Sequence, residues 1–165
     1  NNTSFKFEEI NKLTALEELY VSSCSVNNDS LVYLKNMTSL KVLDVSKNTN
    51  IDNLYNIGTL TGLKVLNISS IKLWETSSLK PLVNMEELYL SGNSNFTLDI
   101  ETMTKLRIID ISETSMFSDI SDLLTITTIE KIVMKNAIQV SCASRDQLHN
   151  TFPNADIDTP RCSTR

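Results

Sequence analysis

A short apolar motif recurs along the chain at intervals of 21 to 24 residues. Its form is L-x-x-L-x-L, and the leading apolar residues of the copies are Leu16, Leu40, Leu63, Met85, Leu106, Ile129 and Phe152. The first six copies are clear, and the seventh, NTFPNADI from Asn150, is degenerate. Self-similarity at such a period is typical of a solenoid, in which each repeat packs only against its neighbours. The motif therefore limits the chain to a stack of similar coils.

Within each copy the last apolar residues alternate with polar ones, which predicts a short strand with one buried face. One coil cannot bury its leucines alone, so the strands are expected to pair in parallel. The predicted first buried column is Leu19, Leu43, Leu66, Leu88, Ile109 and Ile132. The predicted second column is Val21, Val45, Ile68, Leu90, Ile111 and Met134.

These motifs resemble the leucine-rich-repeat superfamily over essentially the whole chain. The stretch VSSCSVNNDSLVYLKNMTSLKVLDVS is similar to the ribonuclease-inhibitor-like class, and LKPLVNMEELYLSGN resembles internalin-type short repeats. The resemblance implies an α/β solenoid, with a curved parallel sheet on the concave side and short helices and irregular turns on the convex side. It also implies one domain over 1–165, with six clear repeats and a degenerate unit at about 141–162.

In this superfamily the turn after each strand holds a buried Asn, Cys or Thr that bonds to the backbone of the bend. The corresponding residues here are Cys24, Asn48, Ile71, Asn93, Thr114 and Ala137. Cys24 is therefore expected to be buried and inert, and the coils of Ile71 and Ala137 to be irregular. Nearby, Trp74 is expected to fill the convex core. The stretch Asn27-Asn28-Asp29-Ser30 is expected to provide the N-cap of a short helix around Leu31 to Leu34.

Composition argues against most other functions. The net charge of −5 and pI of about 4.9 disfavour a nucleic-acid partner, which needs a basic face. No apolar run approaches the roughly 20 residues of a membrane span. The single histidine, His149, is interpreted as an exposed helix-end residue. No phosphate-binding, dinucleotide-binding or C-x-x-C motif occurs. We therefore expect no enzyme activity, no catalytic residue, no metal site and no cofactor.

Cys142 and Cys162 flank the terminal unit, outside the repeat register. A disulfide between them would clamp the end of the solenoid; alternatively, both are free thiols of a cytoplasmic protein. Six N-x-S/T sequons occur, at Asn1, Asn2, Asn28, Asn36, Asn67 and Asn95. Random placement in a chain so rich in Asn, Ser and Thr gives about four, so the sequons are weak evidence and do not decide between the two interpretations. An extracellular or cell-surface location is slightly favoured over a cytoplasmic one.

The concave face is where binding is expected in such a solenoid. Ten residues at outward strand positions form the candidate partner-binding set: Glu18, Tyr20, Val42, Asp44, Val65, Asn67, Glu87, Tyr89, Ile108 and Asp110. Tyrosines supply contact area and carboxylates supply orientation in protein recognition, so this mixture favours a protein partner. In the degenerate unit the outward columns are expected to end at Asn154, Asp156 and Asp158. A third column of serines at positions 22, 46, 69, 91 and 112 is interpreted as structural.

The sequence thus predicts a non-enzymatic protein-binding module of a larger surface or secreted protein. The partner is expected to have a basic or mixed-charge surface. The alternative is the repeat segment of an intracellular scaffold or regulatory protein. Because Asn67 projects from the middle of the proposed binding face, we expect it to be unglycosylated.

Overall fold

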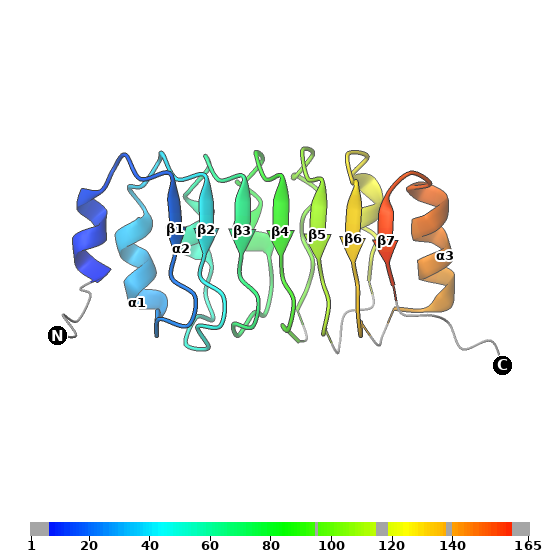
Figure 1. The fold of residues 1–165 in the computed structure, drawn as a ribbon, viewed down its shortest axis with the longest axis horizontal. Helices are drawn as coiled ribbons and strands as arrows, with labels where there is room; N and C mark the ends of the chain where they lie inside the picture. The colour runs from blue at the N-terminus through cyan, green and yellow to red at the C-terminus, as the bar shows by residue number, and fades with distance from the viewer. Residues whose placement is uncertain (1–6, 95, 115–118, 138–139, 160–165) are drawn as a thin grey trace.

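A computed structural model describes residues 7–94, 96–114, 119–137 and 140–159. Their strands form one seven-stranded parallel sheet in chain order, and Figure 1 shows them in a single row along the long axis of the molecule. The strands are β1 (Glu18–Tyr20), β2 (Val42–Asp44), β3 (Val65–Asn67), β4 (Glu87–Tyr89), β5 (Ile108–Asp110), β6 (Lys131–Val133) and β7 (Asp156–Asp158). The predicted α/β leucine-rich-repeat solenoid is confirmed.

The middle residue of each strand points into the core. Leu43, Leu66 and Leu88 have no exposed surface and lie opposite one another in register. The second predicted column is also buried, with Val45, Ile68 and others fully covered. Both buried columns are therefore where the alternation predicted them.

Short helical segments cover the other side of the coils. They are η1 (Phe7–Lys12), α1 (Asn28–Leu31), η2 (Val32–Leu34), α2 (Tyr55–Gly58), η3 (Ser77–Leu79), η4 (Leu123–Thr125) and α3 (Cys142–Thr151). The cap predicted within residues 27–30 is Asn27, whose side chain accepts a hydrogen bond from the backbone N–H of Ser30 at 2.9 Å. Within the described ranges, no helix has the length and apolar character needed to cross a membrane.

The buried asparagine of the turn bonds to the backbone of its own coil and of the one before it. The Asn48 side chain accepts from the backbone N–H groups of Cys24 and Val26, both at 3.0 Å. Its amide donates to the carbonyls of Val21 and Val45 at 2.9 and 2.8 Å. Asn93 bonds in the same way, so these buried polar groups of the bend are paired as expected.

The expected irregularity at Ile71 and Ala137 is wrong for the bend itself. Three residues after the end of each of β1–β6 comes a residue at the same turn position with positive φ: Ser23, Lys47, Ser70, Gly92, Glu113 and Asn136, with φ between 55° and 70°. Ile71 does not need a polar side chain of its own, because Asn93 of the next coil accepts its N–H at 3.1 Å. The left-handed residue, more than the buried amide, is the common element of these turns.

Two apolar side chains lie where the sequence did not predict them. Cys24 is exposed, because it belongs to the first turn and no earlier described strand stacks against that turn. Trp74 is 63% exposed, since the extended segment alternates and Leu73, 4% exposed, takes the inward position instead. The expectations that Cys24 is buried and that Trp74 fills the convex core are both wrong.

The last strand lies two residues later than expected. Lys131 pairs with Asp156 and Val133 with Asp158, so the first outward column ends at Asp156 rather than Asn154. The terminal unit contains the ten-residue helix α3, and β7 begins four residues after the anchor Phe152 instead of two. A shift of two residues keeps the same side chains facing outward.

Candidate recognition surface on the strand face

The ten candidate binding residues lie on the outward side of five adjacent strands. They occupy the first and third positions of β1–β5, and we call them together the strand-face patch. Parallel pairing brings the first positions into one row and the third positions into another. In contrast to the buried middle residues, all ten are exposed or half-buried. The patch is therefore continuous across five of the seven strands, β1–β5.

A hollow of about 200 Å³ lies within this patch, between β1 and β4. Its lining residues are Tyr20, Val42, Leu43, Asp44, Val65, Asn67, Glu87 and Tyr89. Seven of the eight belong to the candidate set, and Leu43 contributes from the core below. Glu18, Ile108 and Asp110 belong to the patch but do not line the hollow.

Each tyrosine of the patch is tied to the glutamate two residues before it. The hydroxyl of Tyr20 donates to Glu18 at 3.0 Å, and that of Tyr89 donates to Glu87 at 2.7 Å. Burial, together with the bonded Glu87, raises the pKa of Tyr89 to about 12. The bond to Glu18 is the largest cause that raises the pKa of Tyr20. Both rings are thus neutral and oriented along their own strands.

Three polar residues of the patch also cap the turns that follow their strands. Asp44 accepts from the backbone N–H of Ser46 at 2.8 Å, and Asp110 accepts from that of Ser112 at 2.9 Å. Asn67 accepts from Ser69 at 3.1 Å in the same way. This role was not predicted, although the repeated spacing Asx-x-Ser is typical of such a turn.

The amide of Asn67 has a second partner. It donates to the carboxylate of Asp44 at 3.2 Å, across the boundary between β2 and β3. The other oxygen of that carboxylate caps Ser46, so both oxygens of Asp44 are engaged and its position is fixed. The Asn67 nitrogen, which a glycan would modify, is thus already used within the sheet.

At three of its five positions the serine column has a structural role, as interpreted from the sequence. Ser46 and Ser112 are buried, and the Ser46 hydroxyl donates to Ser22 at 2.9 Å. Ser112 accepts from the backbone N–H of Lys135 at 3.2 Å. These hydroxyls hold neighbouring turns together rather than facing a partner.

Charge is distributed unevenly along the strand face. At the C-terminal end, Lys131 pairs with Asp156 at 3.2 Å and Lys135 pairs with Asp158 at 3.1 Å. In the patch, the four carboxylates Glu18, Asp44, Glu87 and Asp110 form no salt bridge with any described lysine or arginine. The patch is therefore acidic and its carboxylates form no ion pair with a described residue, while Arg107, paired with Glu130, acts on Glu87 only through space.

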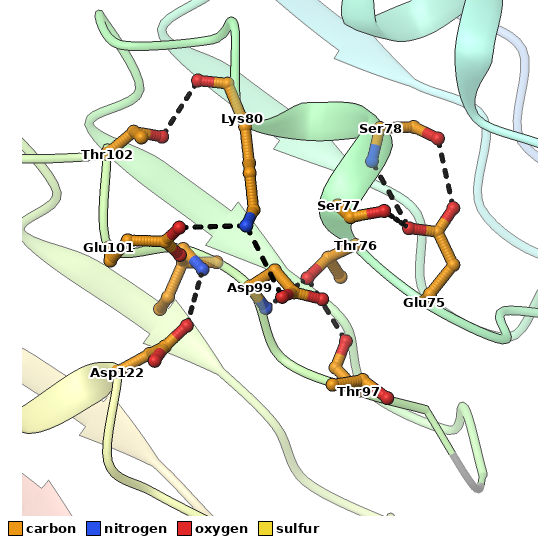
Figure 2. A network of polar contacts seen from close by, with 11 residues as sticks. Glu75, Thr76, Ser77, Ser78, Lys80, Thr97, Asp99, Glu101, Thr102 and Asp122 are labelled. Carbon is orange, nitrogen blue, oxygen red and sulfur yellow. Dashed lines mark hydrogen bonds and ion pairs between the residues drawn. The ribbon is translucent and has the colours of Figure 1, made fainter.

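A second group of carboxylates lies on the helix side of the solenoid. Asp99, Glu101 and Asp122 each place an oxygen within 4.8 Å of the others, and we call them the helix-side cluster. Figure 2 shows the ammonium group of Lys80 against this cluster, 2.9 Å from Glu101 and 3.6 Å from Asp99. The cluster was not predicted, although Lys80, Glu101 and Asp122 follow one another at intervals of 21 residues, one repeat.

The pKa values of two carboxyl groups in the cluster are shifted in opposite directions. Its hydrogen bond is the main cause that lowers the pKa of Glu101. Burial is the main cause that raises the pKa of Asp122, which also accepts from the backbone N–H of Ile100 at 3.2 Å. The cluster is thus a network internal to three coils, with a lysine as its cation.

Cys142 and His149 both belong to α3, which lies next to the last strand, β7. Cys142, at the start of α3, is disulfide-bonded. Its predicted partner Cys162 lies outside the described residues, so the pairing remains a prediction. His149 is exposed in the last turn of α3, which Figure 1 shows beyond β7 and so outside the strands of the patch.

Comparison with solved structures places this architecture. Internalin C2 of Listeria monocytogenes is similar with a TM-score of 0.67 and 18% identity over 79% of this chain and 56% of that one. A leucine-rich-repeat protein of Leptospira interrogans has a TM-score of 0.69 and 19% identity, over 92% and 45% of the two chains. The chain has the leucine-rich-repeat fold. It spans about half the length of these two proteins.

The leucine-rich-repeat fold is also shared with TLR13, solved in complex with the RNA ssRNA13. The TM-score is 0.63, with 15% identity over 79% of this chain and 20% of that one. No protein-family model matches the sequence, and no curated protein matches it. At such identities the likeness establishes the fold, and the function has to be argued from the surface itself.

Proposed function

We propose that this chain is a non-enzymatic protein-binding module whose strand-face patch contacts a partner with a basic or mixed-charge surface. The observation that carries the proposal is the hollow between Tyr20 and Tyr89, set in a patch whose carboxylates form no ion pair with a described lysine or arginine. Aromatic side chains beside fixed polar groups are typical of the anchor points of protein interfaces.

The charge of the patch favours protein over nucleic acid. One structural neighbour, TLR13, was solved with an RNA, so the fold alone does not select the class of partner. Phosphate binding depends on lysine and arginine at the contact surface. Glu18, Asp44, Glu87 and Asp110 present the opposite charge, which would repel a phosphate backbone.

The disulfide at Cys142 supports a surface or secreted protein over the intracellular alternative. Disulfides persist mainly in oxidising compartments, and thiols of cytosolic proteins are usually kept reduced. The secreted interpretation also exposes the sequons to glycosylation. We propose that Asn67 stays unmodified even there, because its amide nitrogen is bonded to Asp44 within a rigid sheet.

A cross-linking experiment with two matched positions tests the proposal. Tyr20, 63% exposed on the strand face, and Tyr55, 69% exposed at the start of α2 on the other side, are each replaced with a photoreactive phenylalanine analogue. The two chains are irradiated in extracts of the source cells and of their surroundings. The same protein should be captured from position 20 and not from position 55. Capture from position 55 alone, or from neither, would contradict the proposal.

A further inference from the structure

We propose that the hollow in the strand-face patch receives one basic side chain, a lysine or an arginine, from an exposed segment of the partner protein. This inference rests on the proposed function and specifies what the patch recognises. It starts from a duplication: β1 and β4 have the same sequence, Glu-Leu-Tyr, and they flank Val-Leu-Asp in β2 and Val-Leu-Asn in β3.

The duplicated strands form two walls around a floor two strands wide. With neighbouring strands about 4.8 Å apart, the backbones of β1 and β4 lie roughly 14 Å from each other. Tyr20 and Tyr89 stand at the two sides, and each hydroxyl is held by the glutamate of its own strand. Because both hydroxyls remain protonated, the rings keep a neutral, electron-rich face of the kind that attracts cations.

The floor is apolar at one end and acidic at the other. Val42 and Val65 lie opposite each other in register, half-buried, at the first strand position. Asp44 lies at the third position, held by Ser46 and Asn67. A lysine or arginine has this same division, with a methylene stem that packs on apolar surface and a charged end that seeks a carboxylate. The floor thus fits the stem over the valines and the cation beside Asp44.

The size of the hollow supports a single side chain. Sites for drug-sized ligands usually measure about 300–1,000 Å³, whereas this hollow measures about 200 Å³. No lysine or arginine lines it among the described residues. A purely apolar occupant would remove Asp44 and Glu87 from water without pairing them, which is costly. An anionic occupant would be repelled.

The helix-side cluster shows how this chain accommodates a cation among carboxylates. There Lys80 from a neighbouring coil supplies the ammonium, 2.9 Å from Glu101. The hollow also offers carboxylates, but no lysine or arginine of the described residues lines it. We assign the cation beside these carboxylates to the partner.

The test uses four peptides of the form Gly-Ser-Gly-X-Gly-Ser-Gly, with blocked ends, where X is arginine, lysine, citrulline or norleucine. Each is titrated at low ionic strength into the isotope-labelled chain, and amide and tyrosine ring resonances are followed by NMR. The arginine and lysine peptides should shift resonances of β1–β4 in a saturable manner. Citrulline, which keeps the shape of arginine without its charge, should bind at least about five-fold more weakly, as should norleucine.

Two isosteric variants provide the matched control. Asp44→Asn removes the charge but keeps the turn cap, because Asn67 makes the same cap with an amide. Asp119→Asn makes the same change at the same kind of turn cap outside the strand-face patch, since Asp119 accepts the backbone N–H of Ser121 at 2.9 Å. Binding of the arginine peptide should fall about five-fold or more in the first variant and less than about two-fold in the second.

Three results would overturn the inference: equal binding of arginine and citrulline, equal loss in the two variants, or shifts confined to β5–β7 or the helix side. The cross-linking result is independent of these. A partner captured at position 20 while the peptides fail to discriminate would leave the protein-binding function standing without a basic anchor. Discriminating peptides without any captured partner would leave a cation site without the proposed function.

Discussion

The molecule has two groups of carboxylates, and they differ in whether the chain supplies a cation of its own. On the helix side, Lys80 joins Asp99 and Glu101, and the three residues bind successive coils to one another. On the strand face, Asp44 and Glu87 bond only to neutral amide and hydroxyl groups. The first arrangement is complete within the fold. The second is held in position but forms no ion pair with a described lysine or arginine, as expected of a surface that binds a charged partner.

The comparison predicts that charges on either side matter less to stability than the core beneath them. Leu66 lies fully buried in the middle of the sheet, under the hollow. Leu66→Ala should reduce the free energy of unfolding by about 2–5 kcal/mol, because it removes transfer energy and leaves a cavity. Urea titration followed by circular dichroism measures the loss. A loss below 1 kcal/mol would mean that the coils around Leu66 can collapse, and that the sheet is not the rigid support assumed for the hollow.

The second effect concerns binding. Asp44→Lys places inside the hollow the kind of cation that the helix side already has. It should weaken partner binding by about 1–2 kcal/mol or more, and Tyr89→Ala should act in the same direction. The free energy of unfolding should change far less than in Leu66→Ala, because Asp44 is half-exposed. Calorimetry with the partner identified by cross-linking measures the binding, with Asp119→Asn, outside the patch, as the control variant. Unchanged affinity in Asp44→Lys would remove the hollow from the interface.

The repeat made most of the fold predictable, because each inward leucine fixes the register of a strand and the period fixes the next one. It failed where a coil departs from the common length. The two extra residues between Phe152 and β7 moved the last strand, and no residue type in that stretch signals them. Trp74 was misplaced for a related reason, since the alternation that buries Leu73 begins in a turn of unpredicted shape.

The strand face was predictable in its membership but not in its bonding. Period-2 geometry is enough to place Asp44 and Asn67 outward. Their bonds to Ser46 and Ser69 depend on the left-handed turn that follows, which only the structure revealed. The helix-side cluster was not predicted from the sequence, because its members lie in loops outside the strand motif. Their regular spacing alone does not show that their side chains meet.

The third effect separates the two acidic groups by pH. Lys80→Gln removes the internal cation and should lower the midpoint of urea unfolding at neutral pH without changing partner binding. The pKa of Glu101 is lowered by Lys80, so that interaction stabilises the fold above the ordinary glutamate pKa and is lost as pH falls through the lowered value. The difference between variant and parent should therefore shrink below about pH 4. A difference that stays constant from pH 7 to pH 3 would show that packing of the Lys80 stem, not its charge, is responsible.

The smallest effect is expected at Asp122 and has the opposite sign. Burial raises its pKa, so the folded state disfavours the ionised carboxylate that is present at neutral pH. Asp122→Asn removes that charge while keeping an oxygen to accept the N–H of Ile100. The variant should be as stable as the parent or more stable by up to about 0.5 kcal/mol at pH 7, since the site is partly solvated. The gain should disappear in acid, where the parent's Asp122 is protonated in both states. Thermal unfolding of both proteins between pH 3 and pH 7 measures it. If Asp122→Asn instead destabilised the protein most at neutral pH, the ionised carboxylate would be a favourable partner of Lys80, and the helix-side cluster would need all three of its charges.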